Sequence, residues 1–348
     1  MRRMLMLASA SVVAAGLWAA SASAEDKMTL VGWGGAASEA INKAVVQPFM
    51  QKTGVKVTED GAGPEMAKIR AMVEAGTVTW DVVQIESGAV IEGCGTTFET
   101  IDWAKLGLDR SKFIGADMTD CGIPLWLWAN VIAYDTTKLN PGPTSINDLF
   151  DLKKFPGKRA LRKRPDANLE WALIADGVPA ADVYKVLATP EGVDRAFKKL
   201  DTIKSEVVWW DAGAQPPQLL ADGQVVMTSA YNGRITSAIN TDKKPFKIVW
   251  DHQVYDFDWY AVVKGTLNLD AAMKYMAFQG MPEQGEAIAN IIPYGPGNRD
   301  ATAKLSPEVL ATLPTAPENM TTAVQVDTKF WADNGAQLIE RFNAWLAQ

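Results

Sequence analysis

The sequence predicts an α/β protein built from two domains. The chain has 348 residues, and domains usually contain about 100–200 residues. Hydrophobic residues make up 48% and charged residues 22% of the sequence, as in globular proteins that bury a sizeable core. Short apolar strands alternate with longer helical patterns from residue 28 onward. This alternation favours a mostly parallel sheet covered by helices.

Residues 1–24 have the pattern of a cleaved signal peptide. Arg2 and Arg3 form a positive start, an apolar run follows over 4–20, and Ala22-Ser23-Ala24 is a small-residue cleavage site. The alternative is an N-terminal membrane anchor, which the short apolar run disfavours. We therefore expect export through the inner membrane and a mature chain that begins near Glu25.

The first five elements form a βαβαβ unit. A strand is predicted over 28–33, ended by Gly34-Gly35, and a helix over 36–53, ended by Gly54. A strand over 55–60, a helix over 64–74 and a buried strand over 80–88 follow.

The same alternation continues in the middle of the chain. Strands are predicted in 157–164, 205–213 and 224–234, and the helices after them in 168–176, in 216–222 and up to Ile239. No tandem repeat interrupts this order.

Charge and residue counts exclude several functions. The net charge of −7 disfavours a nucleic-acid binder, which needs a basic field. His252 is the one histidine, so histidine-based triads and histidine-rich metal sites are disfavoured. Two cysteines are too few for a four-thiolate zinc site. We expect no metal and no cofactor.

Cys94 and Cys121 are the two cysteines of the chain. In an exported protein with an even cysteine count, such residues usually pair. We therefore predict a disulfide between them.

Polar and aromatic residues gather where the predicted strands end. In α/β sheets, ligands bind outside the carboxyl ends of the strands. Any one of these ends is an ordinary loop by itself, but five of the same character indicate a ligand site. The five ends are Trp33-Gly34-Gly35, Glu86-Ser87-Gly88, Arg162-Lys163-Arg164, Trp209-Trp210-Asp211 and Tyr231-Asn232-Gly233-Arg234.

Several segments carry a resemblance to a known family. They are LVGWGG, WDVVQIES, CGIPLWLWANVIAYDTTKL, LLADGQVVMTSAYNGR, PYGPGN and FWADN. In this order and spacing they resemble the spermidine/putrescine-binding family of periplasmic solute-binding proteins, which serve ABC importers. The resemblance covers nearly all of residues 25–348.

The resemblance implies a two-lobe periplasmic-binding-protein fold of type II, with a hinge and a ligand cleft between the lobes. Lobe one would take residues 25–134 and about 259–302, and lobe two residues 135–258 and about 303–348. It also implies a periplasmic monomer that is not an enzyme. Its partners would be a small-molecule solute and an inner-membrane ABC permease and ATPase.

Family positions that hold an amine map onto this chain. Trp33 matches an aromatic wall of the family, Asp258 its ammonium-binding aspartate, and Tyr231 and Tyr294 further aromatic positions. Glu86 stands where the family often has a small hydroxyl residue. Carboxylates neutralise ammonium groups and aromatic faces hold alkyl chains and cations. The alternatives are a solvated turn for Asp258 and core packing for Trp33.

The departures from the family indicate a ligand with an anionic group. Gly34-Gly35-Ala36 replaces an acidic residue and a tyrosine, and Arg162-Lys163-Arg164 stands where polyamine binders place acids. Arg234 or Arg164 would suit a carboxylate, although each also fits a solvated surface position.

The sequence therefore predicts a receptor for a short ω-amino acid such as 4-aminobutyrate, or for a polyamine with one bound ammonium. The alternatives are a receptor of the same fold for another small organic anion and an extracytoplasmic hydrolase. The sequence lacks a GxSxG motif for a hydrolase, and paired carboxylates of the glycosidase kind stay open.

Overall fold

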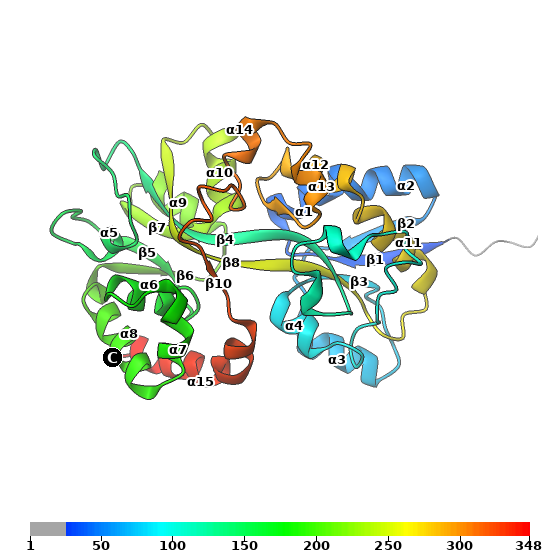
Figure 1. The fold of residues 1–348 in the computed structure, drawn as a ribbon, viewed down its shortest axis with the longest axis horizontal. Helices are drawn as coiled ribbons and strands as arrows, with labels where there is room; N and C mark the ends of the chain where they lie inside the picture. Colours follow the sequence, from blue (N-terminus) through cyan, green and yellow to red (C-terminus); the bar gives the residue numbers. More distant parts are fainter. Residues whose placement is uncertain (1–25) are drawn as a thin grey trace, which may run out of the picture.

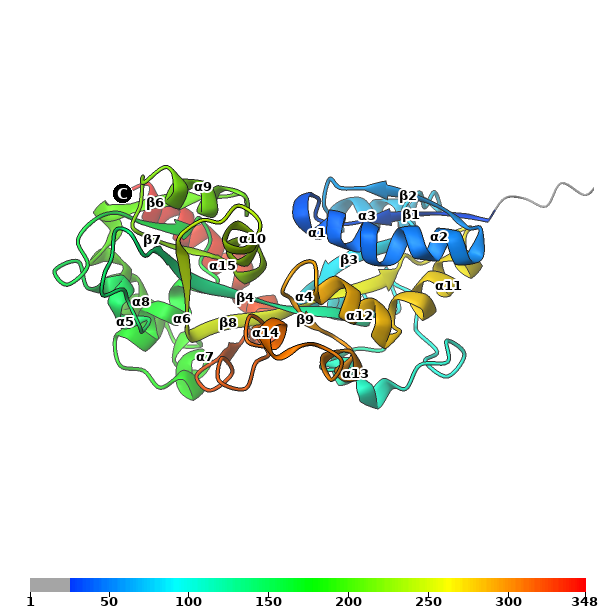
Figure 2. The ribbon, with the colours of Figure 1, turned by 90° about the horizontal axis from the view of Figure 1, so that it is seen from above.

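Two long antiparallel strands, β4 (Ile123–Asp135) and β8 (Phe246–Val262), connect the two halves of the computed structural model (Figures 1 and 2). The structure describes residues 26–348, and the predicted signal peptide lies outside them. All residues of β4 are buried, which suits its continuous apolar sequence. The two halves are called lobe one and lobe two below.

One sheet runs through both lobes in the order β2-β1-β3-β8-β4-β7-β5-β6. The strands of lobe one are parallel to each other, and so are β5, β6 and β7 of lobe two. β4 and β8 are antiparallel to their neighbours β7 and β3. The predicted mostly parallel sheet is thus a mixed sheet, because the chain crosses between the lobes on two strands of opposite direction.

Lobe one holds β1 (Lys27–Val31), β2 (Lys56–Asp60) and β3 (Val82–Glu86). Figure 1 shows α1 (Gly35–Ile41) and α2 (Gln47–Thr53) on one side of these strands, and α3 (Met66–Glu74) and α4 (Ser87–Glu92) on the other. A π-helical turn, η1 (Asn42–Val46), joins α1 to α2, so that 35–53 is continuous helix, as predicted. Gly54 ends it in the left-handed conformation with φ 75°. α11 (Leu269–Gln279) packs beside α2, where the rings of Phe49 and Tyr275 lie 5.3 Å apart.

Lobe two holds β5 (Arg159–Arg162), β6 (Val207–Trp210) and β7 (Met227–Tyr231). α9 (Gln215–Ala221) and α10 (Asn232–Asn240) cover one side of these strands (Figure 1). The other side carries the larger core, which is built by α6 (Asn168–Ala175), α8 (Pro190–Asp201) and α15 (Thr328–Leu346). α8 begins as its sequence predicts, because Thr189 caps it and Pro190 opens its first turn.

Short elements complete the chain. In lobe one these are η2 (Arg110–Lys112) and η3 (Ala116–Met118), and in lobe two α5 (Asn147–Phe150), η4 (Ala180–Asp182), α7 (Val183–Leu187) and η5 (Lys204–Glu206). The segment that returns from lobe one carries α12 (Pro282–Ala289), β9 (Gly295–Pro296), α13 (Arg299–Thr302), α14 (Pro307–Leu310) and β10 (Val324–Gln325).

The predicted lobe boundaries at 134 and 258 fall within β4 and β8, and they stay a prediction. After α14 the chain pairs β10 with β8. It then enters the core of lobe two through Leu338, Phe342 and Trp345 of α15.

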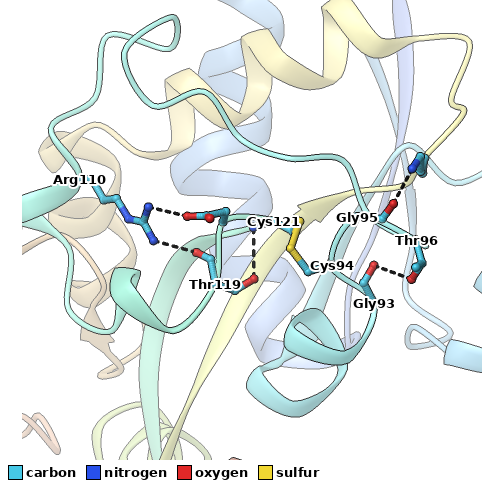
Figure 3. Close-up of a disulfide and its surroundings, with 9 residues drawn as sticks. Gly93, Cys94, Gly95, Thr96, Arg110, Thr119 and Cys121 are labelled. Carbon is cyan, nitrogen blue, oxygen red and sulfur yellow. Dashed lines mark hydrogen bonds and ion pairs between the residues drawn. A yellow bond between two sulfur atoms is a disulfide. The ribbon is translucent and has the colours of Figure 1, made fainter.

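Cys94 and Cys121 form a disulfide, which confirms that prediction. Figure 3 shows the bond joining the turn after α4 to the chain that enters β4, and both segments belong to lobe one. Thr119 Oγ1 accepts a hydrogen bond from the Cys121 backbone N–H at 3.2 Å, and Arg110 donates to the Thr119 carbonyl at 3.2 Å (Figure 3). The bond therefore fixes the start of a strand that crosses to lobe two.

Candidate functional site

A cavity of about 290 Å³ lies between the two lobes, at the small end of the range for small-molecule sites, about 300–1,000 Å³. We call it the first compartment. Lobe one, the crossing strands β4 and β8, and lobe two all contribute to its walls. The side chains used below are Trp33, Gln84, Glu86, Trp126, Trp128, Arg162, Asp211, Tyr231, Arg234, Asp258 and Tyr294.

The carboxyl ends of the parallel strands explain why these side chains meet. Glu86 is the last residue of β3, Arg162 of β5 and Tyr231 of β7. Trp33 follows β1 by two residues and Asp211 directly follows β6. Each of the five strand ends singled out in the sequence thus supplies a side chain to one cavity, as expected for ligand sites of α/β sheets.

Asp258 lies on the floor of the first compartment, where it is 5% exposed. Its Oδ2 accepts hydrogen bonds from Gln84 Nε2 at 2.6 Å and Trp126 Nε1 at 3.0 Å. Its Oδ1 accepts none from the described residues. One oxygen is therefore held by the protein and the other is left for a donor in the cavity.

Burial raises the pKa of Asp258 to about 8, and the nearby Glu86 carboxylate adds to the rise. Burial also raises the pKa of Glu86, against the opposing effect of Arg162. Both shifts record the cost of keeping two carboxylates ionised in a poorly hydrated site. A bound cation would relieve that cost.

Arg234 is the free cation of the first compartment. Within residues 26–348 its side chain forms no ion pair and no hydrogen bond. It reaches across the cleft from α10 to Gly35 of α1, where a Cβ on Gly35 would lie 2.8 Å from Arg234 Nη1. Gly35 has φ 59°, so glycine serves both the backbone turn and the passage of the guanidinium.

Arg162 also lines the first compartment, but it is already paired. Its Nη1 lies 3.0 Å from the Asp166 carboxylate, and Arg164 Nε lies 2.7 Å from the same carboxylate. Burial works against the charge of Asp166, yet Arg162 and Arg164 hold the pKa of that carboxyl below its usual value. A free guanidinium such as Arg234 suits an incoming carboxylate better than one that must first leave its partner.

Aromatic rings form the remaining walls. Trp126 stacks on Tyr294 with the ring centroids 4.8 Å apart, and Trp128 meets Tyr231 edge-on at 5.3 Å. Burial raises the pKa of both tyrosines, so they stay neutral donors. Trp33 is 39% exposed at the mouth. These faces suit a short alkyl chain and a cation.

Asn232 fixes one tyrosine of this wall. Its Oδ1 accepts from the Ala129 backbone N–H at 3.0 Å and its Nδ2 donates to the Pro293 carbonyl at 2.7 Å. The next residue, Gly233, leaves room for the Tyr294 ring, since a Cβ there would lie 2.5 Å from it. The YNG turn therefore positions Tyr294 across the cleft.

Six of the seven predicted ligand-binding residues line the first compartment: Trp33, Glu86, Tyr231, Arg234, Asp258 and Tyr294. Arg164 does not. It lines a neighbouring cavity, because the chain turns directly after β5 and the Arg164 N–H bonds the Arg162 carbonyl at 2.8 Å. The ligand-binding role of all seven stays a prediction.

Sequence reasoning missed Gln84, Trp126 and Trp128, and it indicated Arg162 and Asp211 only as parts of strand ends, without a ligand-binding role. Two signals were present. Gln84 precedes Glu86 by two residues on a strand, and Trp126 and Trp128 alternate with leucine in the same way, so each pair shares a face. Because these three side chains lie on buried strands, their sequence pattern resembles that of residues in a hydrophobic core.

Two further observations limit the chemistry of the described chain. Over residues 26–348, no group of three histidine, cysteine or acidic side chains is placed to hold a metal. Within the same range, no helix is both long and apolar enough to cross a bilayer.

Comparison with known proteins adds independent information. The model of the family "bacterial extracellular solute-binding protein" matches residues 44–321. A curated gamma-aminobutyric acid-binding protein from Pseudomonas aeruginosa is 46% identical over 333 residues, which cover 95% of this chain and 94% of the relative.

Two solved structures are similar along most of the chain. The Atu4243–GABA receptor has a TM-score of 0.82 and 34% identity, over 92% of this chain and 98% of its own. The periplasmic binding protein MotA from A. tumefaciens B6, solved with glucopine, has a TM-score of 0.83 and 33% identity, over 92% and 99%. These likenesses bear out the two-lobe α/β fold.

Proposed function

Because the chain belongs to the family of bacterial extracellular solute-binding proteins, we propose that it captures 4-aminobutyrate, or a close ω-amino acid, in the first compartment. The protein is a solute-binding protein for small amino-containing ligands and not an enzyme. The observation that carries the choice of ligand is the pair of free charges, Asp258 Oδ1 on β8 and the Arg234 guanidinium on α10.

The ammonium of the ligand binds Asp258 with Glu86 nearby, and the carboxylate binds Arg234 at the Gly34-Gly35 side of the cleft. The short alkyl chain lies against Trp126, Trp128 and Tyr294. An arginine fork matches a carboxylate in a bidentate manner, and hydrogen bonds to charged groups stabilise by about 1.5–3 kcal/mol. Binding across the cleft favours the closed arrangement of the lobes.

A polyamine is the second candidate, in keeping with the sequence resemblance to the spermidine/putrescine-binding family. The acidic pair Glu86 and Asp258 favours it. Arg234 opposes it, because an unpaired guanidinium group in the same cavity repels a second ammonium. The ω-amino acid offers an ammonium to the acidic side chains and a carboxylate to the guanidinium, whereas the polyamine offers only ammonium groups.

The relatives also support a transport role. One similar structure, 32% identical with a TM-score of 0.83, is described as an ABC transporter substrate-binding protein from Bradyrhizobium japonicum. The proposed partners are accordingly an inner-membrane ABC permease and its ATPase. The family places the protein outside the cytoplasm, and we propose that it works as a monomer in the periplasm.

Calorimetry with matched ligands tests the proposed function. 4-Aminobutyrate carries both charges, n-butylamine lacks the carboxylate, butyrate lacks the ammonium, and 1,4-diaminobutane replaces the carboxylate by a second amine. Protein unfolded, dialysed and refolded to remove any carried solute should bind 4-aminobutyrate at least tenfold more tightly than each of the others. Equal or tighter binding of the diamine would contradict the carboxylate half of the proposal.

A further inference from the structure

A second cavity of about 380 Å³ adjoins the first. It lies between α4 of lobe one and α15 of lobe two, which Figure 1 shows approaching each other beside the crossing strands. The two helices come close where a Cβ on Gly88 would lie 3.7 Å from Thr328. Glu86 and Trp128 line both cavities, so the two cavities adjoin at these side chains. We call this cavity the second compartment.

Asp256 has the same arrangement in the second compartment that Asp258 has in the first. It is 6% exposed, and its Oδ1 accepts hydrogen bonds from Ser87 Oγ at 2.6 Å and the Phe257 N–H at 2.8 Å. Its Oδ2 accepts none from the described residues. Asp256 and Asp258 are two residues apart on β8, about 7 Å along the strand. Each compartment therefore has one buried aspartate with one oxygen left over.

The other charged side chains of the second compartment have partners within the described residues, although Arg164 shares its partner with Arg162. Arg164 pairs with Asp166 at 2.7 Å, and Glu92 at the rim pairs with Arg70 at 2.6 Å. That leaves Asp256, with Glu86 between the two compartments, as the acids free to meet a ligand. The remaining walls are largely apolar and include Ala167, Val254, Val326, Trp331 and Ile339. An alkyl arm that ends in an ammonium matches this combination.

We propose that the second compartment binds a cationic arm attached to the amine end of the ligand, so that N-aminoalkyl ω-amino acids occupy both compartments. This inference rests on the proposed function, which places the ligand amine at Asp258. From there, an N-substituent passes Glu86 and Trp128 and brings its terminal ammonium to Asp256. The unsubstituted ω-amino acid fills the first compartment alone.

Two ligands of equal length test the inference by calorimetry. 4-(3-Aminopropylamino)butyrate carries the terminal ammonium, and 4-(butylamino)butyrate has a methyl group in its place. The first should bind wild-type protein about tenfold or more tightly than the second. Asp256→Asn should abolish that ratio, whereas Asp242→Asn, which removes an equal charge from an exposed loop lining neither compartment, should preserve it.

A second variant tests whether the N-substituent occupies the second compartment. Ala336 is an exposed residue of α15 that lines the second compartment. Ala336→Leu keeps a strong helix former there and fills part of the cavity. It should weaken both N-substituted ligands about tenfold and leave 4-aminobutyrate unaffected.

The possible results of these titrations either support or overturn the proposed cationic subsite. Equal affinity of the two N-substituted ligands for wild type, or an unchanged ratio in Asp256→Asn, would overturn the cationic subsite. Failure of both to bind while 4-aminobutyrate binds would overturn the inference and leave the proposed function standing. If 4-aminobutyrate itself did not bind, the proposed function would fail, and the inference with it.

Discussion

Glu86 of β3 and Asp258 of β8 lie directly opposite each other in an antiparallel pair of strands, and both line the first compartment. Like charges at such positions repel each other when both are ionised. Burial together with this repulsion raises the pKa of Asp258 to about 8. A cation bound beside them replaces repulsion by attraction, so the empty site favours a ligand with an ammonium group.

Asp258→Asn should weaken binding of 4-aminobutyrate about a hundredfold. The substitution keeps the size of the side chain and removes the charge that the ammonium needs. An unpaired buried charge costs about 3 kcal/mol or more, and each ~1.4 kcal/mol is a factor of ten in affinity. Calorimetry measures the change, with the exposed-loop variant Asp242→Asn as the control. Equal affinities of the two variants would move the ammonium away from Asp258.

Arg234→Ala should also weaken 4-aminobutyrate by at least tenfold, because the carboxylate loses its free partner. The same variant should bind 1,4-diaminobutane as well as wild type does, or better, because a repelling charge is gone. Arg195→Ala, which removes an arginine paired with Asp176 on the surface, should change neither affinity. A parallel loss for both ligands would show that Arg234 supports the fold of the site and does not read the carboxylate.

Affinity for 4-aminobutyrate should increase with pH between 6 and 8. The raised pKa of Asp258, about 8, means that its carboxyl is mostly protonated at pH 6 and must lose that proton to bind an ammonium. The association constant therefore gains up to tenfold per pH unit and levels off above pH 8, while the ligand amine keeps its proton to about pH 10. Titrations at pH 6, 7 and 8 measure the slope, and a flat or falling profile would contradict it.

The stability of the ligand-free protein should decrease as the pH rises, whereas the affinity for 4-aminobutyrate increases. Burial raises the folded-state pKa of Asp258 to about 8 and of Asp256 and Glu170 to about 7. The folded state then holds protons that the unfolded chain releases near pH 4, so stability is lost as the pH rises from about 4 to 8. Thermal unfolding should show this decline, and 4-aminobutyrate should raise the melting temperature more at pH 8 than at pH 6.

The sequence was sufficient to predict that the five strand ends lie together. Five strand ends of polar and aromatic character, from Trp33 to Arg234, supply side chains to one cavity because parallel strands end at the same edge of a sheet. The sequence was not sufficient to predict that Arg162 lines the first compartment and Arg164 the second. Two residues apart, they differ only in that the chain turns tightly between them, and that turn has no signature in RKR.

The cavity-lining residues on the crossing strands β4 and β8 were even harder to predict from the sequence. Trp126 and Trp128 lie in a run of 13 buried residues, where an aromatic side chain usually packs in a core. That they line a cavity follows from the gap between the lobes, which is a property of the whole fold. The same holds for the second compartment, whose walls come from α4 and α15, far apart in the sequence.

The Cys94–Cys121 bond should stabilise lobe one. Free-thiol titration of denatured, unreduced protein should find no thiol. A bond across this sequence separation of 27 contributes about 3–4 kcal/mol in the chain-entropy model. The double variant Cys94→Ser, Cys121→Ser should lose stability of that order in urea unfolding and still bind 4-aminobutyrate when folded, because both cysteines lie outside the first compartment. Unchanged stability would assign the bond no structural role.

A crystal structure of the protein with bound 4-aminobutyrate tests the central claim most directly. It should place the ligand in the first compartment with its ammonium within about 3.2 Å of Asp258 Oδ1 and its carboxylate on the Arg234 guanidinium. The alkyl chain should lie against Trp126 and Tyr294. A ligand bound in the reverse direction, with its carboxylate on Arg162 and its ammonium away from Asp258, or bound outside this cavity, would contradict the account.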